Sequence, residues 1–201
     1  MLHPRYPIET TRLHLRPLVE ADFEDFYAYD TSPEVARYLY WEPRGPAESR
    51  EAFERHLRTT ALEREGDALV LGIVWREVGK VVGHASLGWV SSDHQSGEIG
   101  FIVSPAYQGH GLAIEAAEAM LGLGFDGLRL HRIVGQCDGR NRSSARLMER
   151  LGMRREAHLV ENEYVKGEWT DELIYAGSRD RLRDRRRSRS VARCGECHQD
   201  L

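Results

Sequence analysis

The chain has little of what marks membrane and secreted proteins. Its longest apolar runs, such as Ala68 to Trp75, are far shorter than the roughly 20 residues that a membrane-spanning helix needs. The N-terminus lacks the charged and apolar regions of a signal peptide, and three cysteines, at positions 137, 194 and 197, cannot form a closed disulfide framework. We therefore expect a cytoplasmic protein that makes no membrane contact.

Metal-binding patterns are missing as well. The nine histidines form neither an H-x-x-x-H nor an H-E-x-x-H pattern, so no metal site is expected. The segment from Cys194 to His198 matches C-x-x-C-H, the spacing of covalent haem attachment, but neither an export signal nor an apolar haem pocket accompanies it. For Cys194 and Cys197, adventitious zinc binding and no role at all stay open.

Length and charge predict one domain followed by a tail. The chain has 201 residues, 41% of them hydrophobic and 30% charged, which is enough for one sizeable core. Residues 178–201 hold eight arginines and four acidic residues, so a tail of charge +4 follows a body of charge −8. Because the tail has few apolar residues, we expect a globular domain over 1–177 and disorder beyond it. Contact with a ribosome or RNA is one hypothesis for these arginines.

Apolar periodicity predicts a mixed α/β fold. The early strands are expected to pair antiparallel, with a short turn at Gly79-Lys80, and a strand-helix-strand unit follows in the middle of the chain. The expected strands are 12–18, 68–78, 81–90, 98–103, 132–137, 155–164 and 169–176. The expected helices are 21–30, 33–40, 45–65, 109–125 and 142–151.

The segment with the clearest chemical meaning joins the strand at 98–103 to the next helix. It reads Gln108-Gly109-His110-Gly111-Leu112-Ala113. Glycines let a ligand approach the backbone, and the first turn of a helix carries N–H groups without intrahelical partners, which bind phosphate. Ile114 departs from the dinucleotide-binding G-x-G-x-x-G pattern, and no Gly-Lys-Ser/Thr of a Walker loop follows. A tight turn without a ligand is the structural alternative.

This segment resembles the acetyl-CoA binding motif of the GCN5-related N-acetyltransferase (GNAT) family, which has Gln or Arg, two residues, Gly, one residue, and Gly or Ala. Gln108, Gly111 and Ala113 occupy those positions. The resemblance covers residues 8–176 and is greatest to the ribosomal-protein-alanine N-acetyltransferases (RimJ/RimL-like). It rests there on IETTRLHLRPL, on the helix entry Asn141-Arg142-Ser143-Ser144 and on the closing EWTDELIYA.

The resemblance implies a GNAT fold, in which a mixed, mostly antiparallel central sheet is splayed open after the strand at 98–103 and is flanked by helices. It also implies acetyl-CoA as the co-substrate, with pantetheine pairing to the backbone near Ile102 and Val103. Asn141 would hold the pantetheine amides or only stabilise a turn. The remaining implied cofactor contacts are Gln108, Ser144 and, for the diphosphate, the N–H groups of Gly109, His110, Gly111, Leu112 and Ala113.

Amine acetylation needs a base for the amine proton and a proton source for the departing thiolate. Glu98 shares a strand face with Gly100 and Ile102, which is expected to lie beside the cofactor gap. It is the candidate base, with an ordinary ion pair as the structural alternative. Ser144 is the donor that the resemblance implies, with a helix N-cap as the alternative. The implied reaction is direct transfer in a ternary complex.

The expected acceptor is the N-terminal α-amine of a protein, the substrate of the branch that the chain resembles. Tyr40, Trp41 and Trp89 are aromatic residues near loops that could border the acceptor, with core packing as the alternative. A small amine (polyamine, amino acid or antibiotic) stays open because the acidic body suits a cation. A catalytically degenerate RNA- or ribosome-binding module is a third hypothesis, and intact Gln108, Gly111 and Glu98 argue against it. The sequence leaves the oligomeric state open, a homodimer included.

Overall fold

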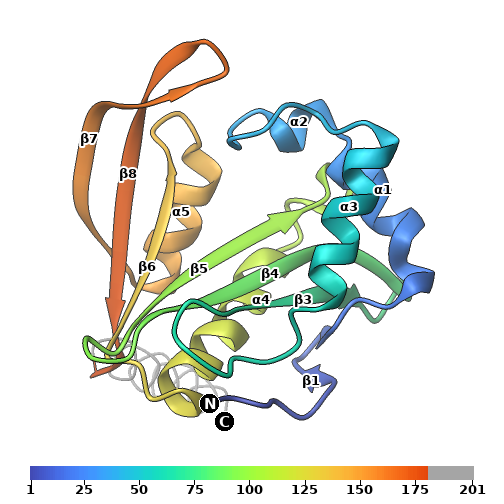
Figure 1. Ribbon diagram of the computed structural model, residues 1–201, viewed down its shortest axis with the longest axis horizontal. Helices are drawn as coiled ribbons and strands as arrows, with labels where there is room; N and C mark the ends of the chain where they lie inside the picture. Colours follow the sequence, from blue (N-terminus) through green and yellow to red (C-terminus); the bar gives the residue numbers. More distant parts are fainter. Residues whose placement is uncertain (181–201) are drawn as a thin grey trace, which may run out of the picture.

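The structure, a computed structural model, describes residues 1–180 (Figure 1). The tail expected over 178–201 lies, except for its first three residues, in 181–201, outside the described part of the chain, together with the arginine-rich contact with a ribosome or RNA and the C-x-x-C-H segment. The helices are α1 (Phe23–Asp30), α2 (Pro33–Ala36), α3 (Pro46–Leu57), α4 (Leu112–Gly122) and α5 (Arg142–Leu151). The strands are β1 (Ile8–Glu9), β2 (Leu13–Arg16), β3 (Ala68–Trp75), β4 (Lys80–Ser91), β5 (Ser96–Val103), β6 (Arg132–Asp138), β7 (Arg154–Val165) and β8 (Glu168–Ser178).

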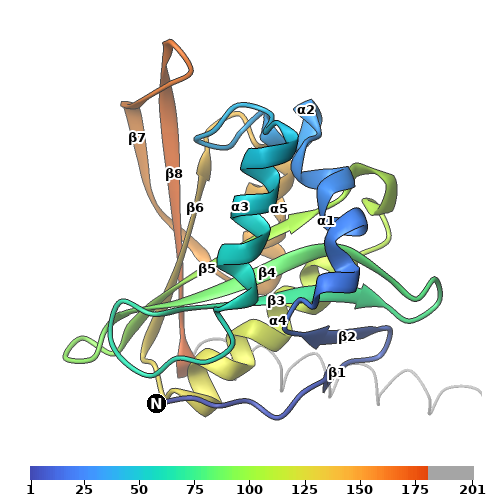
Figure 2. The same ribbon diagram turned by 45° about the vertical axis from the view of Figure 1, so that its right-hand side comes forward.

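One eight-stranded sheet in the order β1-β2-β3-β4-β5-β6-β8-β7 forms the centre of the fold. β5 and β6 run parallel and are connected through α4, whereas the other neighbouring strands pair antiparallel. This confirms the predicted mixed, mostly antiparallel α/β sheet and its strand-helix-strand unit. Helices α1 and α3 cover one face of the sheet, and α4 and α5 cover the other (Figures 1 and 2).

Each face of the sheet has its own apolar core. The larger core lies on the side of α4 and α5 and contains Leu87, Ile99 and Met148, each at most 3% exposed. The smaller core lies on the side of α1 and α3 and contains Phe26 and Phe53, both fully buried. Each such side chain contributes about 1.5–3 kcal/mol by leaving water. The central strands are therefore held between two packed helical layers.

β5 and β6 pair with each other at one end only. Their parallel register joins residues 96–98 to residues 132–134. Beyond that point β5 stays with β4, β6 stays with β8, and the two strands diverge into a V, here named the splay (Figure 1). The splay thus begins after Glu98, part-way along the strand over 98–103 that was expected to border it. In the described chain the inner edges of the V have no ladder partner, so an extended chain with amide groups can pair there.

Several boundaries differ from the expected ones because distant contacts or glycines intervene. The helix expected over 45–65 ends at Leu57, since fully buried Leu62 instead pairs with Leu2 in an isolated bridge. The helix expected over 33–40 stops at Ala36. The strand expected over 68–78 ends at Trp75, whose carbonyl accepts a hydrogen bond from the N–H of Gly79 and closes a wider turn. Strand β1 was not expected at all.

Two histidines are buried beside the smaller core. The ring centroids of His56, in α3, and His84, in β4, are 5.0 Å apart, and the Tyr29 hydroxyl lies 3.0 Å from Nδ1 of His84. Burial, with smaller contributions from neighbouring positive charges, lowers the pKa of His56 to about 4 and that of His84 to about 3. Both rings are therefore neutral at pH 7.

Acid should destabilise the fold through this pair. An unfolded histidine titrates near pH 6.5, so below about pH 6.5 the unfolded chain binds protons that the native chain does not, and stability falls as the pH drops toward about 4. Each histidine contributes up to about 1.4 kcal/mol per pH unit in that window. Urea midpoints measured at about pH 7.5, 6 and 5 should fall more steeply for the wild-type chain than for His84→Gln, which cannot titrate. Equal slopes would remove His84 from this effect.

Candidate active site

The open end of the splay brings two helix N-termini together. β5 leads at its carboxyl end into a loop and α4, and β6 leads into α5, so both helices begin at the open end of the V (Figure 1). Helix N-termini present unpaired N–H groups and a partial positive charge. Ligands of open α/β sheets bind at the carboxyl ends of strands where the connections part. The splay is therefore the candidate site.

Gly109 and Gly111 shape the loop between β5 and α4. Both are left-handed, with φ of +82° and +74°, and Gly111 is the N-cap of α4. Residues other than glycine rarely adopt this backbone conformation, which is not helical. Helix α4 therefore begins at Leu112 rather than at Gly109 as expected. The Gln108 side chain braces the loop, because its Nε2 donates to the Val103 carbonyl at 3.0 Å. Backbone N–H groups in such a turn form a concavity suited to an anion.

The other predicted cofactor residues lie around this loop. His110 is exposed, and its ring packs against Trp75, with 5.2 Å between ring centroids. Leu112 is 1% exposed and anchors α4 in the larger core, while Ala113 is partly buried in the first turn. Ile102 packs against the smaller core, near the end of β5. The side chains of this segment thus hold the loop in place, and its backbone is what a cofactor can use.

Asn141, not Ser144, caps α5. The Asn141 Oδ1 accepts a hydrogen bond from the backbone N–H of Ser144 at 3.1 Å. Such a cap contributes about 1 kcal/mol to helix stability. The N-cap role that was the alternative for Ser144 therefore belongs to Asn141. Ser144 itself is half-buried, and within residues 1–180 no hydrogen bond of its hydroxyl group is found.

Glu98 lies on the face opposite the larger core. Ile99 and Val103 face that core, so alternation along β5 places Glu98, Gly100 and Ile102 on the side of α1 and α3. Partial burial raises the pKa of Glu98. No ion pair of Glu98 is found in the described chain. The alternative role, a carboxylate held in an ordinary ion pair, therefore has no partner residue there. Its position at the apex of the splay suits a proton acceptor.

Two further carboxylates, missed by sequence analysis, occupy the same face. Glu172 of β8 is 6% exposed, and Glu163 of β7 pairs in register with Thr170 of β8. Burial raises the pKa of Glu172, and the charges of Glu163 and Glu98 raise it further. The Tyr40 hydroxyl donates to Glu163 Oε1 at 3.0 Å. Glu98, Glu163 and Glu172 are here named the carboxylate cluster.

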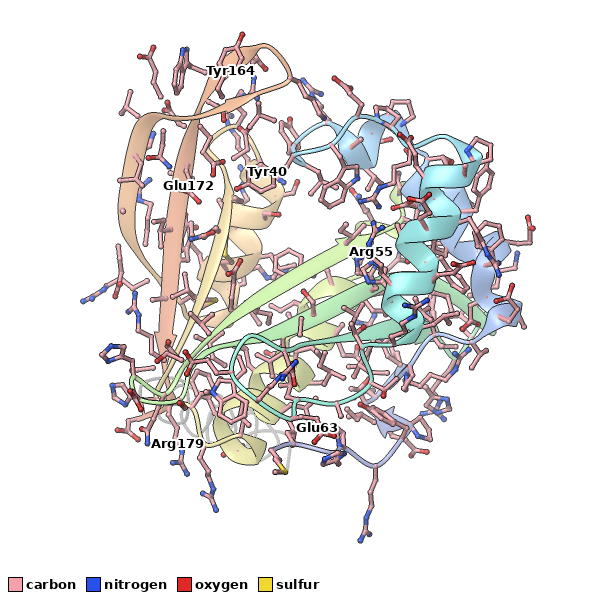
Figure 3. All side chains as sticks on the ribbon, in the orientation of Figure 1. Tyr40, Arg55, Glu63, Tyr164, Glu172 and Arg179 are labelled. Carbon is pink, nitrogen blue, oxygen red and sulfur yellow. The ribbon has the colours of Figure 1, made fainter. Side chains whose placement is uncertain are left out.

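The three aromatic acceptor candidates are not gathered in one place. Tyr40 lies near Glu172, and Arg55 of α3 lies across the opening of the V from both (Figure 3). The Arg44 guanidinium stacks over Trp41, with its Cζ 4.3 Å from the centroid of the Trp41 ring. Trp41 also lines an open hollow of about 270 Å³. Trp89 packs against the larger core on the other face of the sheet. The structure therefore brings Tyr40, and not Trp89, to the carboxylate cluster.

Neither a membrane-spanning helix nor a metal-binding cluster is found in residues 1–180. In this part of the chain, none of the helices combines the length and apolar character that crossing a membrane requires. The same residues contain no group of three or more histidine, cysteine, aspartate or glutamate side chains placed to hold a metal ion.

Comparison with known proteins agrees with this geometry. The family described as Acetyltransferase (GNAT) domain matches residues 12–154, which include the splay, the loop and Glu98. The chain belongs to the GNAT acetyltransferase family. It is accordingly an acetyl-CoA-dependent N-acetyltransferase, and its sheet and flanking helices are the GNAT fold. The residues of the loop and the splay suit acetyl-CoA, since one supplies N–H groups for a diphosphate and the other an unpaired strand edge for amides.

Relatives of this GNAT protein act on different amines. The uncharacterized N-acetyltransferase YnaD of Bacillus subtilis is 32% identical over 170 residues, which cover 84% of this chain and 95% of the relative. Spermidine N(1)-acetyltransferase of Escherichia coli is 26% identical over 160 residues, covering 79% of this chain and 82% of the relative. The [ribosomal protein uS5]-alanine N-acetyltransferase of Escherichia coli is 25% identical over 114 residues, covering 56% and 59%. The resemblance to the RimJ/RimL-like branch is therefore not confirmed.

Solved GNAT structures share the fold. The crystal structure of a GNAT acetyltransferase from Bacillus anthracis has a TM-score of 0.77 at 29% identity and covers 86% of this chain and 98% of that one. Spermidine N-acetyltransferase from Vibrio cholerae, solved in complex with CoA and spermine, has a TM-score of 0.72 at 22% identity and covers 86% and 99%. The second likeness concerns the fold alone.

Proposed function

We propose that this GNAT enzyme acetylates a small cationic acceptor with more than one amine, a polyamine-like molecule, at the carboxylate cluster. The observation that carries the proposal is that, within residues 1–180, no ion pair is found for Glu98, Glu163 or Glu172. Neighbouring carboxylates repel one another, and a bound cation relieves that repulsion. The spermidine acetyltransferases among the relatives support the same class of acceptor.

The cluster divides into two roles. Glu98 is the proposed base because it lies where the splay begins. Glu172 accepts a hydrogen bond from Asn162 Nδ2 at 2.8 Å, and Glu163 accepts one from Tyr40. These two carboxylates are thus held in place and are proposed to bind the ammonium group that does not react. An acceptor with two amines separated by a short methylene chain satisfies both roles.

The chemistry follows from these positions. Acetyl-CoA supplies the acetyl group as a thioester. As the acceptor nitrogen forms its bond to the acetyl carbon and the C–S bond breaks, Glu98 takes the proton that the nitrogen loses, directly or through water. Ser144 is the proposed proton donor to the departing sulfur. Burial raises the pKa of Cys137 to about 11, so this thiol offers no nucleophile at neutral pH, and direct transfer in a ternary complex is proposed.

Acetyl-CoA is proposed to bind along the splay. The backbone of Ile102 and Val103 would pair with pantetheine, and the N–H groups from Gly109 to Ala113 would hold the diphosphate. Asn141 contributes by keeping the start of α5 at the splay, because its side-chain oxygen already accepts from Ser144. The carbonyl of Val103 already accepts a hydrogen bond from the Gln108 side chain, the contact that braces the loop.

Ser144→Ala should lower the acetylation rate by about tenfold or less, a smaller effect than that of replacing the proposed base Glu98. A hydroxyl is a weak acid, and a thiolate is a fair leaving group without protonation. The acetyl-CoA affinity should stay within a few-fold, since the cap from Asn141 uses only the backbone of Ser144. Steady-state rates of Ser144→Ala and of the neighbouring control Ser143→Ala test this. Equal rates in the two variants would remove Ser144 from proton transfer.

A protein N-terminal α-amine is the second candidate acceptor. Such an amine, with a pKa of about 8, needs only a modest base, whereas a lysine-type amine near 10.4 needs more help. The ribosomal-protein-alanine acetyltransferase among the relatives supports this candidate. Tyr164 and Trp169, which are 64% and 61% exposed and stack edge to face on the β7–β8 hairpin, offer a surface that a peptide can contact.

An acceptor screen with one variant distinguishes the two. Wild-type enzyme and acetyl-CoA are incubated with spermidine, putrescine, aminoglycosides, N-terminal alanine peptides and internal-lysine peptides, and acetylated products are quantified by mass spectrometry. We expect the highest kcat/KM for a polyamine. Glu172→Gln should raise the polyamine KM about 10-fold or more with little change in kcat, because it removes a charge that binds rather than reacts. Glu161→Gln, an exposed control on the neighbouring strand β7, should change neither. Preferred acetylation of peptides, with KM unaffected by Glu172→Gln, would favour the second candidate.

A further inference from the structure

One arginine joins the N-terminal segment to the loop before α4. Arg12 directly precedes β2, and its carbonyl accepts a hydrogen bond from the backbone N–H of Arg76 at 3.0 Å, so its backbone is anchored at the edge of the sheet. Its Nη1 donates to the carbonyl of His110 at 2.7 Å, and its Nε donates to Glu115 Oε2 at 2.8 Å. The guanidinium therefore bridges the middle of the loop and the first turn of α4.

Glu115 is the fixed partner in this bridge. Its Oε1 accepts hydrogen bonds from the Thr10 hydroxyl at 2.6 Å and from the Arg12 backbone at 2.7 Å. Burial works to raise the pKa of Glu115, but these hydrogen bonds outweigh it and hold the pKa below its usual value. The carboxylate is thus ionised beside a loop that is proposed to bind an anion, and Arg12 balances its charge.

The hydrogen bond to His110 also fixes the direction of the next N–H group. The His110 carbonyl and the Gly111 N–H belong to one trans peptide unit, which is planar, so the two groups point in opposite directions. Left-handed glycines flank His110 on both sides, and glycine allows such a unit to rotate with little steric resistance. A contact that holds the carbonyl is therefore needed to hold the N–H.

We propose that Arg12 is a positioning residue for the diphosphate of acetyl-CoA: by holding the His110 carbonyl it locks the peptide unit whose Gly111 N–H faces the phosphate. The inference rests on the proposed diphosphate role of Gly109 to Ala113. Arg12 acts through the loop, because the N–H that it orients points away from its own guanidinium. Its ion pair with Glu115 keeps the guanidinium in place and balances the negative charge that Glu115 would otherwise present near the diphosphate.

The test compares acetyl-CoA with S-acetylpantetheine, which has the same thioester and pantetheine arm but no diphosphate. In full-length Arg12→Gln, the KM for acetyl-CoA should rise about 10- to 100-fold with kcat within about threefold, because ground-state binding is lost and chemistry is not. The kcat/KM for S-acetylpantetheine should match wild type. Arg12→Lys should be intermediate, since an ammonium group cannot donate in the forked geometry of a guanidinium.

Arg16→Gln is the matched control. Arg16 is the last residue of β2, the strand that Arg12 precedes, and has the same kind of partner, with Nη1 2.6 Å from Asp22 Oδ2. This variant should lose stability without a change in the KM for acetyl-CoA. An Arg12→Gln enzyme with the wild-type KM, or with equal losses on both thioesters, would overturn the role of Arg12 alone. A wild-type enzyme that used both thioesters equally well would overturn the diphosphate role of the loop as well.

Discussion

Glu98→Gln should lower kcat about 10²- to 10⁴-fold, the usual contribution of a positioned base, and should leave the KM for acetyl-CoA within a few-fold. The carboxamide keeps the size of the side chain but cannot accept the amine proton. Glu98 is the member of the carboxylate cluster at the apex of the splay, so its loss should affect the rate, whereas loss of Glu172 should affect acceptor binding. Steady-state kinetics with the preferred acceptor measures both constants.

The pH profile separates a base from a structural carboxylate. Partial burial raises the pKa of Glu98, and a base works only when ionised, so wild-type activity should fall as the pH drops through that raised pKa. In Glu98→Gln the rate should instead climb about tenfold per pH unit toward the pKa of the acceptor amine, where the neutral nucleophile forms unaided. Glu77→Gln, an exposed glutamate between β3 and β4, is the control. A wild-type rate for Glu98→Gln from about pH 6 to 9 would make Glu98 a structural carboxylate.

Gly111→Val should reduce acetyl-CoA affinity at least about 100-fold without unfolding the protein. At φ +74° a β-branched residue is strained by about 1–3 kcal/mol, and relief of that strain rotates the N–H group proposed to bind the diphosphate. A Cβ at this position would also lie 3.5 Å from Arg12 Nη2, so the valine methyl groups would displace the guanidinium that holds the loop. Titration calorimetry with acetyl-CoA measures the effect.

Gly79→Val controls for the strain itself. Gly79 also has a left-handed φ, +67°, and a Cβ there would meet no atom within 4 Å in the turn between β3 and β4. The two variants therefore carry a similar conformational penalty, and only one lies in the loop. Unchanged affinity in Gly111→Val would remove the diphosphate assignment. Equal loss of affinity in both variants would show that general destabilisation is the cause.

Strand faces and helix entries could be predicted from neighbouring residues. The alternation from Glu98 to Val103 predicts which side chains share a face, because the pleat of a strand imposes it whatever lies alongside. The paired glycines before α4 predict a turn with free N–H groups for the same local reason. The end of α3 could not be predicted in this way, since it depends on Leu62 pairing with Leu2, far away in the chain.

The acceptor side of the site shows the limit of local patterns. Glu172 immediately precedes the apolar residues Leu173, Ile174 and Tyr175. This position indicates a carboxylate on a half-buried strand, so the sequence could have identified Glu172 as a candidate. Its closeness to Glu98 could not, because it requires β8 to lie between β6 and β7. Trp89 was a reasonable acceptor candidate by its loop-side position, and only its packing against the larger core separates it from Tyr40.

The family, the loop before α4 and the face of Glu98 follow from contiguous residues, and the sequence alone is sufficient for them. The carboxylate cluster, the cap of α5 by Asn141 in place of Ser144 and the hold of Arg12 on His110 appear only in the folded chain. Each of these joins residues whose approach depends on strand order, register or the exact start of a helix. Local periodicity carries no information about those quantities, because they are decided by which distant surfaces pack together.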